Sequence, residues 1–182
     1  GPGLFYHRTS GHALVVGGTW SGSQDNVWKI ALGDGPVVPV GHWTSPDGVS
    51  ARIDAIDGAA GRVFLATRGD GLWRYDAGDT RTQFTAGNSV LETNQINDVR
   101  YDLTTDYAYV AADNGWTLNN ADDLFSLRSG SPAHAVEVRP GATNPLNAYF
   151  FGTDNGVLWR TDNGIAAIDL DGQVISSLAL EP

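Results

Sequence analysis

The sequence contains no cysteine, which excludes disulfides, thiolate zinc sites, iron–sulfur clusters and cysteine nucleophiles. Basic residues are also few: 11 Lys and Arg, with Lys29 the single lysine, stand against 21 Asp and Glu, for a net charge of −10. That balance argues against a surface that binds the nucleic-acid backbone. The apolar runs are too short to span a bilayer or to form the core of a signal peptide.

Helical patterns are also scarce, whereas strand patterns fill the chain of 182 residues. No long segment carries apolar residues at helical spacing, and no convincing capping box precedes one. Short runs rich in Val, Ile, Tyr, Phe and Trp instead alternate with clusters of Gly, Asp and Asn. With 41% hydrophobic residues the chain is expected to fold, and these runs predict an all-β protein.

One pattern occurs four times: an apolar run, then a Gly/Asp/Asn turn, then a strand with an aromatic residue. The turn positions Asn26, Gly71, Gly115 and Gly156 are separated by 45, 44 and 41 residues. This period is typical of a four-stranded propeller blade. The second strand of each repeat is apolar at consecutive positions, which indicates burial on both faces, as in a strand between two stacked sheets.

The predicted domain covers 1–182 and holds four blades, at about 4–43, 51–88, 96–130 and 135–169. The expected strands are 4–10, 12–19, 26–32, 36–43, 51–57, 61–68, 71–77, 82–88, 96–102, 106–113, 115–120, 124–130, 135–140, 147–154, 156–162 and 165–169. A further strand is expected over 173–180. Four blades are few for a closed ring. The chain is therefore either a small closed propeller or an arc of a larger one whose end sheets need partners.

Two segments carry a resemblance to known families. Leu91-Glu-Thr-Asn94-Gln-Ile96-Asn97-Asp98-Val99 resembles the propeller repeats in the periplasmic sensor regions of two-component regulators. The segment 151–164 is similar to sialidase-type repeats that end in an Asp-box, although Arg160 and Ala167 replace the usual residues. The resemblance implies a propeller fold and an extracytoplasmic location.

The innermost strands of a propeller line its channel, so their polar residues are the first candidates for a ligand site. Aligning two of these strands places Asp98 with Glu137 and Arg100 with Arg139, and each acid then shares a face with its arginine. These four residues either bind a polar ligand or neutralise one another along the channel wall. If the protein were an enzyme, Asp98 and Glu137 would be the acids to test first.

The tryptophans near turns are a second set of candidates. Trp20, Trp43 and Trp116 lie in or beside turn-rich segments, where an indole can stack on a sugar ring, anchor a protein partner or cap the sheets. The tripeptide Arg68-Gly69-Asp70 falls in a predicted hairpin, as adhesive tripeptides do. The four histidines are isolated in the sequence, so neither a metal nor another cofactor is predicted.

The sequence therefore predicts an acidic, extracytoplasmic, non-catalytic module, secreted or periplasmic, which presents ligand-binding or protein-binding loops on a rigid propeller scaffold. Its expected partner is a protein or a carbohydrate, with possible assembly into a larger set of blades or with other subunits. The alternatives are a sialidase-like or glycoside-hydrolase-like enzyme and a structural subunit of a larger complex.

Overall fold

The computed structural model describes residues 4–7, 12–18, 25–31, 38–44, 52–59, 62–76, 80–89, 91–120, 123–127, 131–139, 149–161 and 164–179. For the first four strands and for 116–127 it describes the backbone and its pairing. Over these ranges the secondary structure consists of strands and turns. The predicted all-β class is confirmed.

The described strands form four antiparallel sheets of four strands, each sheet built from consecutive strands in chain order. Sheet 1 contains β1 (Leu4–His7), β2 (His12–Gly18), β3 (Asp25–Ala31) and β4 (Val38–Thr44). Sheet 2 contains β5 (Arg52–Ala59), β6 (Arg62–Arg68), β7 (Leu72–Asp76) and β8 (Thr80–Phe84). Sheet 3 contains β9 (Ile96–Asp102), β10 (Tyr107–Ala112), β11 (Gly115–Asn120) and β12 (Asp123–Leu127). Sheet 4 contains β13 (Ala133–Val138), β14 (Tyr149–Thr153), β15 (Gly156–Thr161) and β16 (Gly164–Asp169).

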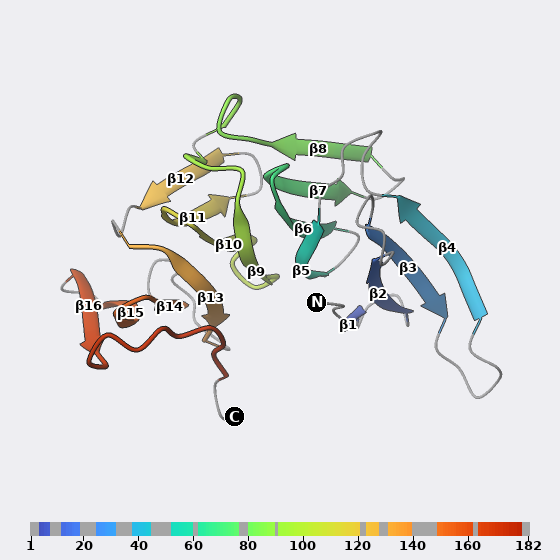
Figure 1. Cartoon of the computed structure of the whole chain (residues 1–182). Helices are drawn as coiled ribbons and strands as arrows, with labels where there is room; N and C mark the ends of the chain where they lie inside the picture. The colour runs from blue at the N-terminus through green and yellow to red at the C-terminus, as the bar shows by residue number, and fades with distance from the viewer. Residues whose placement is uncertain are drawn as a thin grey trace.

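The sheets are arranged as a fan (Figure 1). The first strand of each sheet lies toward the middle of the fan and the fourth strand lies at its outside. Neighbouring sheets meet through their first strands: β1 contacts β5, β5 contacts β9, and β9 contacts β13. The polar side chains of β5, β9 and β13 are therefore brought to the inner side of the fan.

Two of the tight turns depend on glycine. Gly71 immediately precedes the third strand of sheet 2, and Gly156 is the first residue of the third strand of sheet 4. Their φ angles are 77° and 121°, which residues with a side chain rarely adopt. A Cβ atom would lie 2.1 Å from the Phe84 carbonyl oxygen at Gly71, and 2.0 Å from the Ile168 carbonyl oxygen at Gly156. The two positions are equivalent, so the repeat extends to backbone detail.

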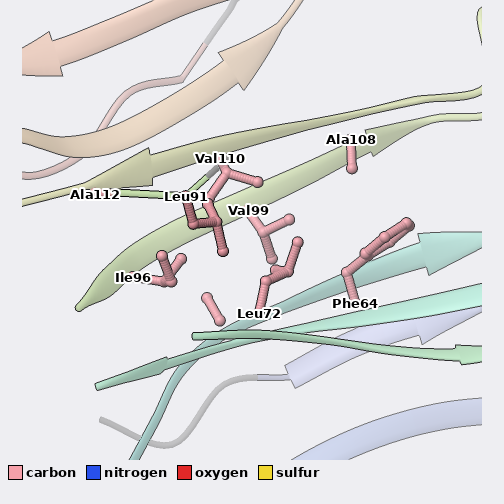
Figure 2. Close-up of a cluster of buried hydrophobic side chains, with 9 residues drawn as sticks. Phe64, Leu72, Leu91, Ile96, Val99, Ala108, Val110 and Ala112 are labelled. Carbon is pink, nitrogen blue, oxygen red and sulfur yellow. The ribbon is translucent and has the colours of Figure 1, made fainter. Parts of the chain in front are cut away.

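The hydrophobic cores lie between the sheets. A cluster between sheets 2 and 3 contains Phe64, Ala66 and Leu72 on one side and Val99 and Val110 on the other (Figure 2). A second cluster joins sheets 3 and 4, and a third lies on the opposite side of sheet 2. In β6 and β10, five consecutive residues are buried, so the predicted burial of the second strand on both faces is confirmed for these two strands.

The segment after β16 does not form the strand that the sequence predicts there. Residues 173–179 belong to no strand, and the predicted strand's last residue lies outside the described ranges. The segment instead lies along β14, where the Ile175 amide donates to the Thr153 carbonyl oxygen at 3.0 Å. One backbone bond does not make a ladder, and Gly152 leaves room for the Ile175 side chain against the sheet.

Candidate functional site

Each of the three innermost strands with described side chains has an irregularity at the same place. The pairing of β5 with β6 skips Asp54, that of β9 with β10 skips Asn97, and that of β13 with β14 skips His134. Such a bulge turns the extra side chain out of the regular alternation of the strand. Three different polar side chains therefore occupy one backbone position on neighbouring sheets.

The residue before each bulge pairs with a residue of the second strand, and the bulged side chain contacts the residue that follows this partner in the chain. Arg68 Nε donates to Asp54 Oδ2 at 2.8 Å. Asn97 Nδ2 donates to Asp113 Oδ1 at 2.8 Å, and His134 Nε2 lies 2.6 Å from Asp154 Oδ1. We call these three contacts the rim pairs. They combine an acid with an arginine, an amide with an acid, and a histidine with an acid.

The rim pairs are accessible in part. The Arg68 side chain is 50% exposed, whereas its partner Asp54 is 6% exposed and also contacts Arg52 Nε through its other oxygen at 2.5 Å. Asn97 also donates to the Ala133 carbonyl oxygen at 2.9 Å, which ties sheet 3 to sheet 4. The rim pairs therefore hold charged and hydrogen-bonding groups in fixed positions while solvent still reaches them.

A second polar group lies further along the innermost strands, and its acids connect neighbouring sheets. Asp57 accepts the Gly58 amide at 2.9 Å and, across the sheet junction, the Tyr101 amide at 2.7 Å. Asp98 accepts the Val99 amide at 2.9 Å and, across the next junction, the Val136 amide at 3.0 Å. Each carboxylate thus holds a backbone N–H of its own strand and one of the next sheet.

Arg100 lies among these acids. Its Nη1 donates to Asp98 Oδ1 at 3.1 Å, and its Nε lies 3.6 Å from Glu137 Oε2. Burial raises the pKa of Asp57 to about 6, partly opposed by the bond from the Tyr101 amide and by Arg100. Burial also raises the pKa of Asp98, again opposed by Arg100. Arg100, Asp98 and Glu137 therefore form one group, in which a single guanidinium contacts two carboxylates.

The register corrects the alignment predicted from the sequence. Arg100 is opposite Tyr109 and Glu137 is opposite Phe150, which are equivalent positions of β10 and β14. Glu137 is therefore equivalent to Arg100, and Asp98 is equivalent to Ala135. The predicted match of Asp98 with Glu137 and of Arg100 with Arg139 was displaced by two residues, because it followed the acid-to-arginine spacing, which the strand pairing does not preserve.

The other predicted residues are not brought into this group. Arg139 is exposed and follows β13. Trp20 lies outside the described residues, and Trp43 and Trp116 are known through their backbone pairing in β4 and β11. The Arg68-Gly69-Asp70 tripeptide is unsuited to adhesion, because Asp70 is 9% exposed and Arg68 contacts Asp54.

Sequence reasoning missed the rim pairs. An alignment anchored on the Asp-Asn-Gly turns of 113–115 and 154–156 does not find them either, because these turns are 41 residues apart whereas Asn97 and His134 are 37 residues apart. Over the described residues, three or more His, Cys, Asp or Glu side chains never gather as a metal site would require. The described part of the chain also includes no helix with the length and apolarity of a membrane span.

Comparison with known proteins gives fold-level similarity. No family model matches the chain, and no curated protein matches it. Two solved structures of extracellular domains from B. thetaiotaomicron are similar. One, from a putative hybrid two-component system, has a TM-score of 0.63 and 11% identity over 98% of this chain and 29% of that chain. The other, described as from a putative one-component system, has a TM-score of 0.64 and 15% identity over 92% of this chain and 22% of that chain.

Proposed function

We propose that this chain is part of an extracytoplasmic sensing module that binds a polar ligand at the rim pairs, without catalysis. The observation that carries the proposal is the presence of three chemically different polar pairs at one repeated backbone position. A rigid scaffold that varies its polar groups at a fixed place is suited to recognition. The similarity to extracellular domains of signalling systems supports both the location and the sensing role.

The four sheets are proposed to be blades of a propeller-type domain. The meander order within each sheet, the fan of first strands and the cores between sheets support that arrangement. This chain corresponds to 29% and 22% of the two similar structures, so the activity of a whole sensor is a larger proposal than the binding role of this part.

A carbohydrate or a protein segment rich in polar groups is the ligand class that the rim pairs fit best. Arg52 and Arg68 offer donors, and Asp113 and Asp154 offer acceptors. Arg139 follows the end of β13 opposite to His134, so it is not proposed as a contact of the rim pairs. Trp20, Trp43 and Trp116 stay candidate ligand contacts predicted from the sequence. Asp98 and Glu137 are less suited to acid–base catalysis than the sequence suggests, because Asp98 already accepts three hydrogen bonds.

A glycan array probed with the labelled 182-residue chain tests the proposal. We expect a polar saccharide to bind, and the Asn97→Ala and His134→Ala variants to lose binding at least about tenfold, which is what the loss of one charge-assisted hydrogen bond costs. Leu103→Ala is the matched control, since Leu103 is 53% exposed and follows the opposite end of β9. Equal binding by all three variants would refute the rim as the site.

A fluorogenic glycoside screen separates binding from catalysis. The proposal predicts no turnover. If the wild-type chain hydrolysed a glycoside and the Asp98→Asn or Glu137→Gln variant did not, the binding proposal would be wrong and the protein would be an enzyme.

A further inference from the structure

The face of sheet 4 that points away from sheet 3 has the features of a sheet junction. In sheets 2 and 3, the equivalent positions carry Phe64 and Tyr109, which are 1% and 0% exposed because the next sheet covers them. In sheet 4 this position is Phe150, which is only partly buried. Ile168, on the same face through its pairing with Val157, is 48% exposed. The face is apolar and only partly covered.

Glu137 repeats half of the bond pattern that holds neighbouring sheets together. Asp57 uses one oxygen for the next amide of its own strand and the other for an amide of the next sheet. Glu137, at the equivalent position, accepts the Val138 amide at 3.1 Å through Oε1. Its Oε2 lies 3.6 Å from Arg100 Nε, beyond ordinary hydrogen-bond length. The position is therefore arranged to accept an N–H from another innermost strand.

The segment after β16 follows the path of a linker between sheets. In sheet 2, Leu91 comes seven residues after Phe84 and inserts into the core beside Ala66. In sheet 4, Ile175 comes seven residues after Ile168, the equivalent of Phe84, and lies against Gly152, the equivalent of Ala66. Leu91 is 3% exposed because sheet 3 covers it, whereas Ile175 is only partly buried and Val174 is 57% exposed.

We infer that this face of sheet 4 docks a further four-stranded sheet of the same repeat, and that in solution sheet 1 of a second copy of this chain supplies it. The occupant has to present an innermost strand to Glu137 and an apolar sheet face to Phe150 and Ile168. Sheet 1 has the same strand order, and Figure 1 shows sheets 1 and 4 at opposite ends of the fan. The contact is thus head-to-tail, the kind that closes a ring or extends a filament.

Sedimentation velocity of the whole chain, from low micromolar to several hundred micromolar, tests the inference. We expect the mass to rise with concentration. Ile168→Lys should weaken association at least about tenfold, because it places a charge in an apolar contact. Leu103→Lys is the matched control, since Leu103 is similarly exposed at 53% but lies in the β9–β10 turn. Glu137→Gln should also weaken association, and circular dichroism verifies that each variant is folded.

A monomer at every concentration would overturn the inference, as would equal effects of the two lysine variants. Because the chain has no cysteine, Ile168→Cys introduces a single thiol. Rapid disulfide formation between two such chains would show a face-to-face contact and would also overturn the head-to-tail arrangement. None of these results depends on ligand binding at the rim pairs, so the two proposals can fail separately.

Discussion

The carboxyl group of Asp57 should make the stability of the protein depend on pH in an unusual direction. Burial raises its pKa in the folded protein to about 6, above the ordinary aspartate pKa of 3.8. Its folded form therefore holds a proton more tightly than its unfolded form. The contribution to stability is complete below the unfolded pKa and is lost as the pH rises through 6.

The size of this effect follows from the difference between the two pKa values. One pKa unit corresponds to about 1.4 kcal/mol, so Asp57 should lower the free energy of unfolding by roughly 2 to 3 kcal/mol between pH 4 and pH 8. In Asp57→Asn the side chain no longer titrates, and this loss disappears. Subtracting the variant's free energy of unfolding from that of the wild type at each pH isolates the contribution of this residue from those of all other acids.

Urea unfolding followed by tryptophan fluorescence measures these free energies across the pH range. Asp171→Asn is the matched control, because Asp171 is exposed and has a φ angle of 56°, which asparagine accepts. We expect the Asp57→Asn difference to change with pH by more than the difference between this control and the wild type. If the Asp57→Asn difference instead varied by less than about 0.5 kcal/mol, the assignment of the raised pKa to buried Asp57 would be refuted.

Two further predictions concern the sheet junctions. Asp98→Ala should lower the melting temperature by at least about 5 °C, because it removes the side-chain acceptor of the Val136 amide and one of the acceptors of Arg100, at a cost of about 2 to 4 kcal/mol; an unchanged thermal melt would contradict this role. Gly152→Ala should speed hydrogen exchange at the Ile175 amide, because its Cβ would lie 2.6 Å from the Ile175 carbonyl oxygen. Gly87→Ala is the control, since its Cβ would meet only Thr85 Oγ1 at 3.8 Å; equal exchange in both variants would argue against the close packing of the segment on β14.

The sequence was sufficient to predict most strands, because the period of the turns sets where each strand begins and ends. For example, strands were expected over 96–102 and 115–120, and β9 and β11 have these bounds. The turn glycines explain this success, since Gly71 and Gly156 occupy backbone conformations that few other residues accept. The residue types at the turns therefore determined where these strands begin and end.

The register of the innermost strands could not be predicted in the same way. A bulge adds one residue without changing the apolar pattern visibly, so the shift at Asn97 or His134 is set by pairing with the second strand. The polar contacts of the innermost strands also join residues that are far apart in the chain, such as Asp57 and the Tyr101 amide. Alternation within one strand contains no information about such partners.

The strand over 173–180 was predicted from composition, and its failure has a physical reason. A run of aliphatic residues forms a strand only where a neighbouring edge supplies several hydrogen bonds. Here Ile175 finds one backbone partner, Thr153. Ile175 instead packs against Gly152 of sheet 4, whereas Val174 is 57% exposed.

The bulged residues have a consequence for how such a protein can change over generations. Asp54, Asn97 and His134 stand outside the regular pairing of their strands, so the side chain that each has to match is its rim-pair partner and not an opposite residue of the ladder. If the rim pairs bind the ligand as proposed, point mutations at these places would change its recognition while the backbone pairing of the surrounding strands stays the same. Asn97 is the exception, because it also donates to the Ala133 carbonyl oxygen of the next sheet and so contributes to the architecture.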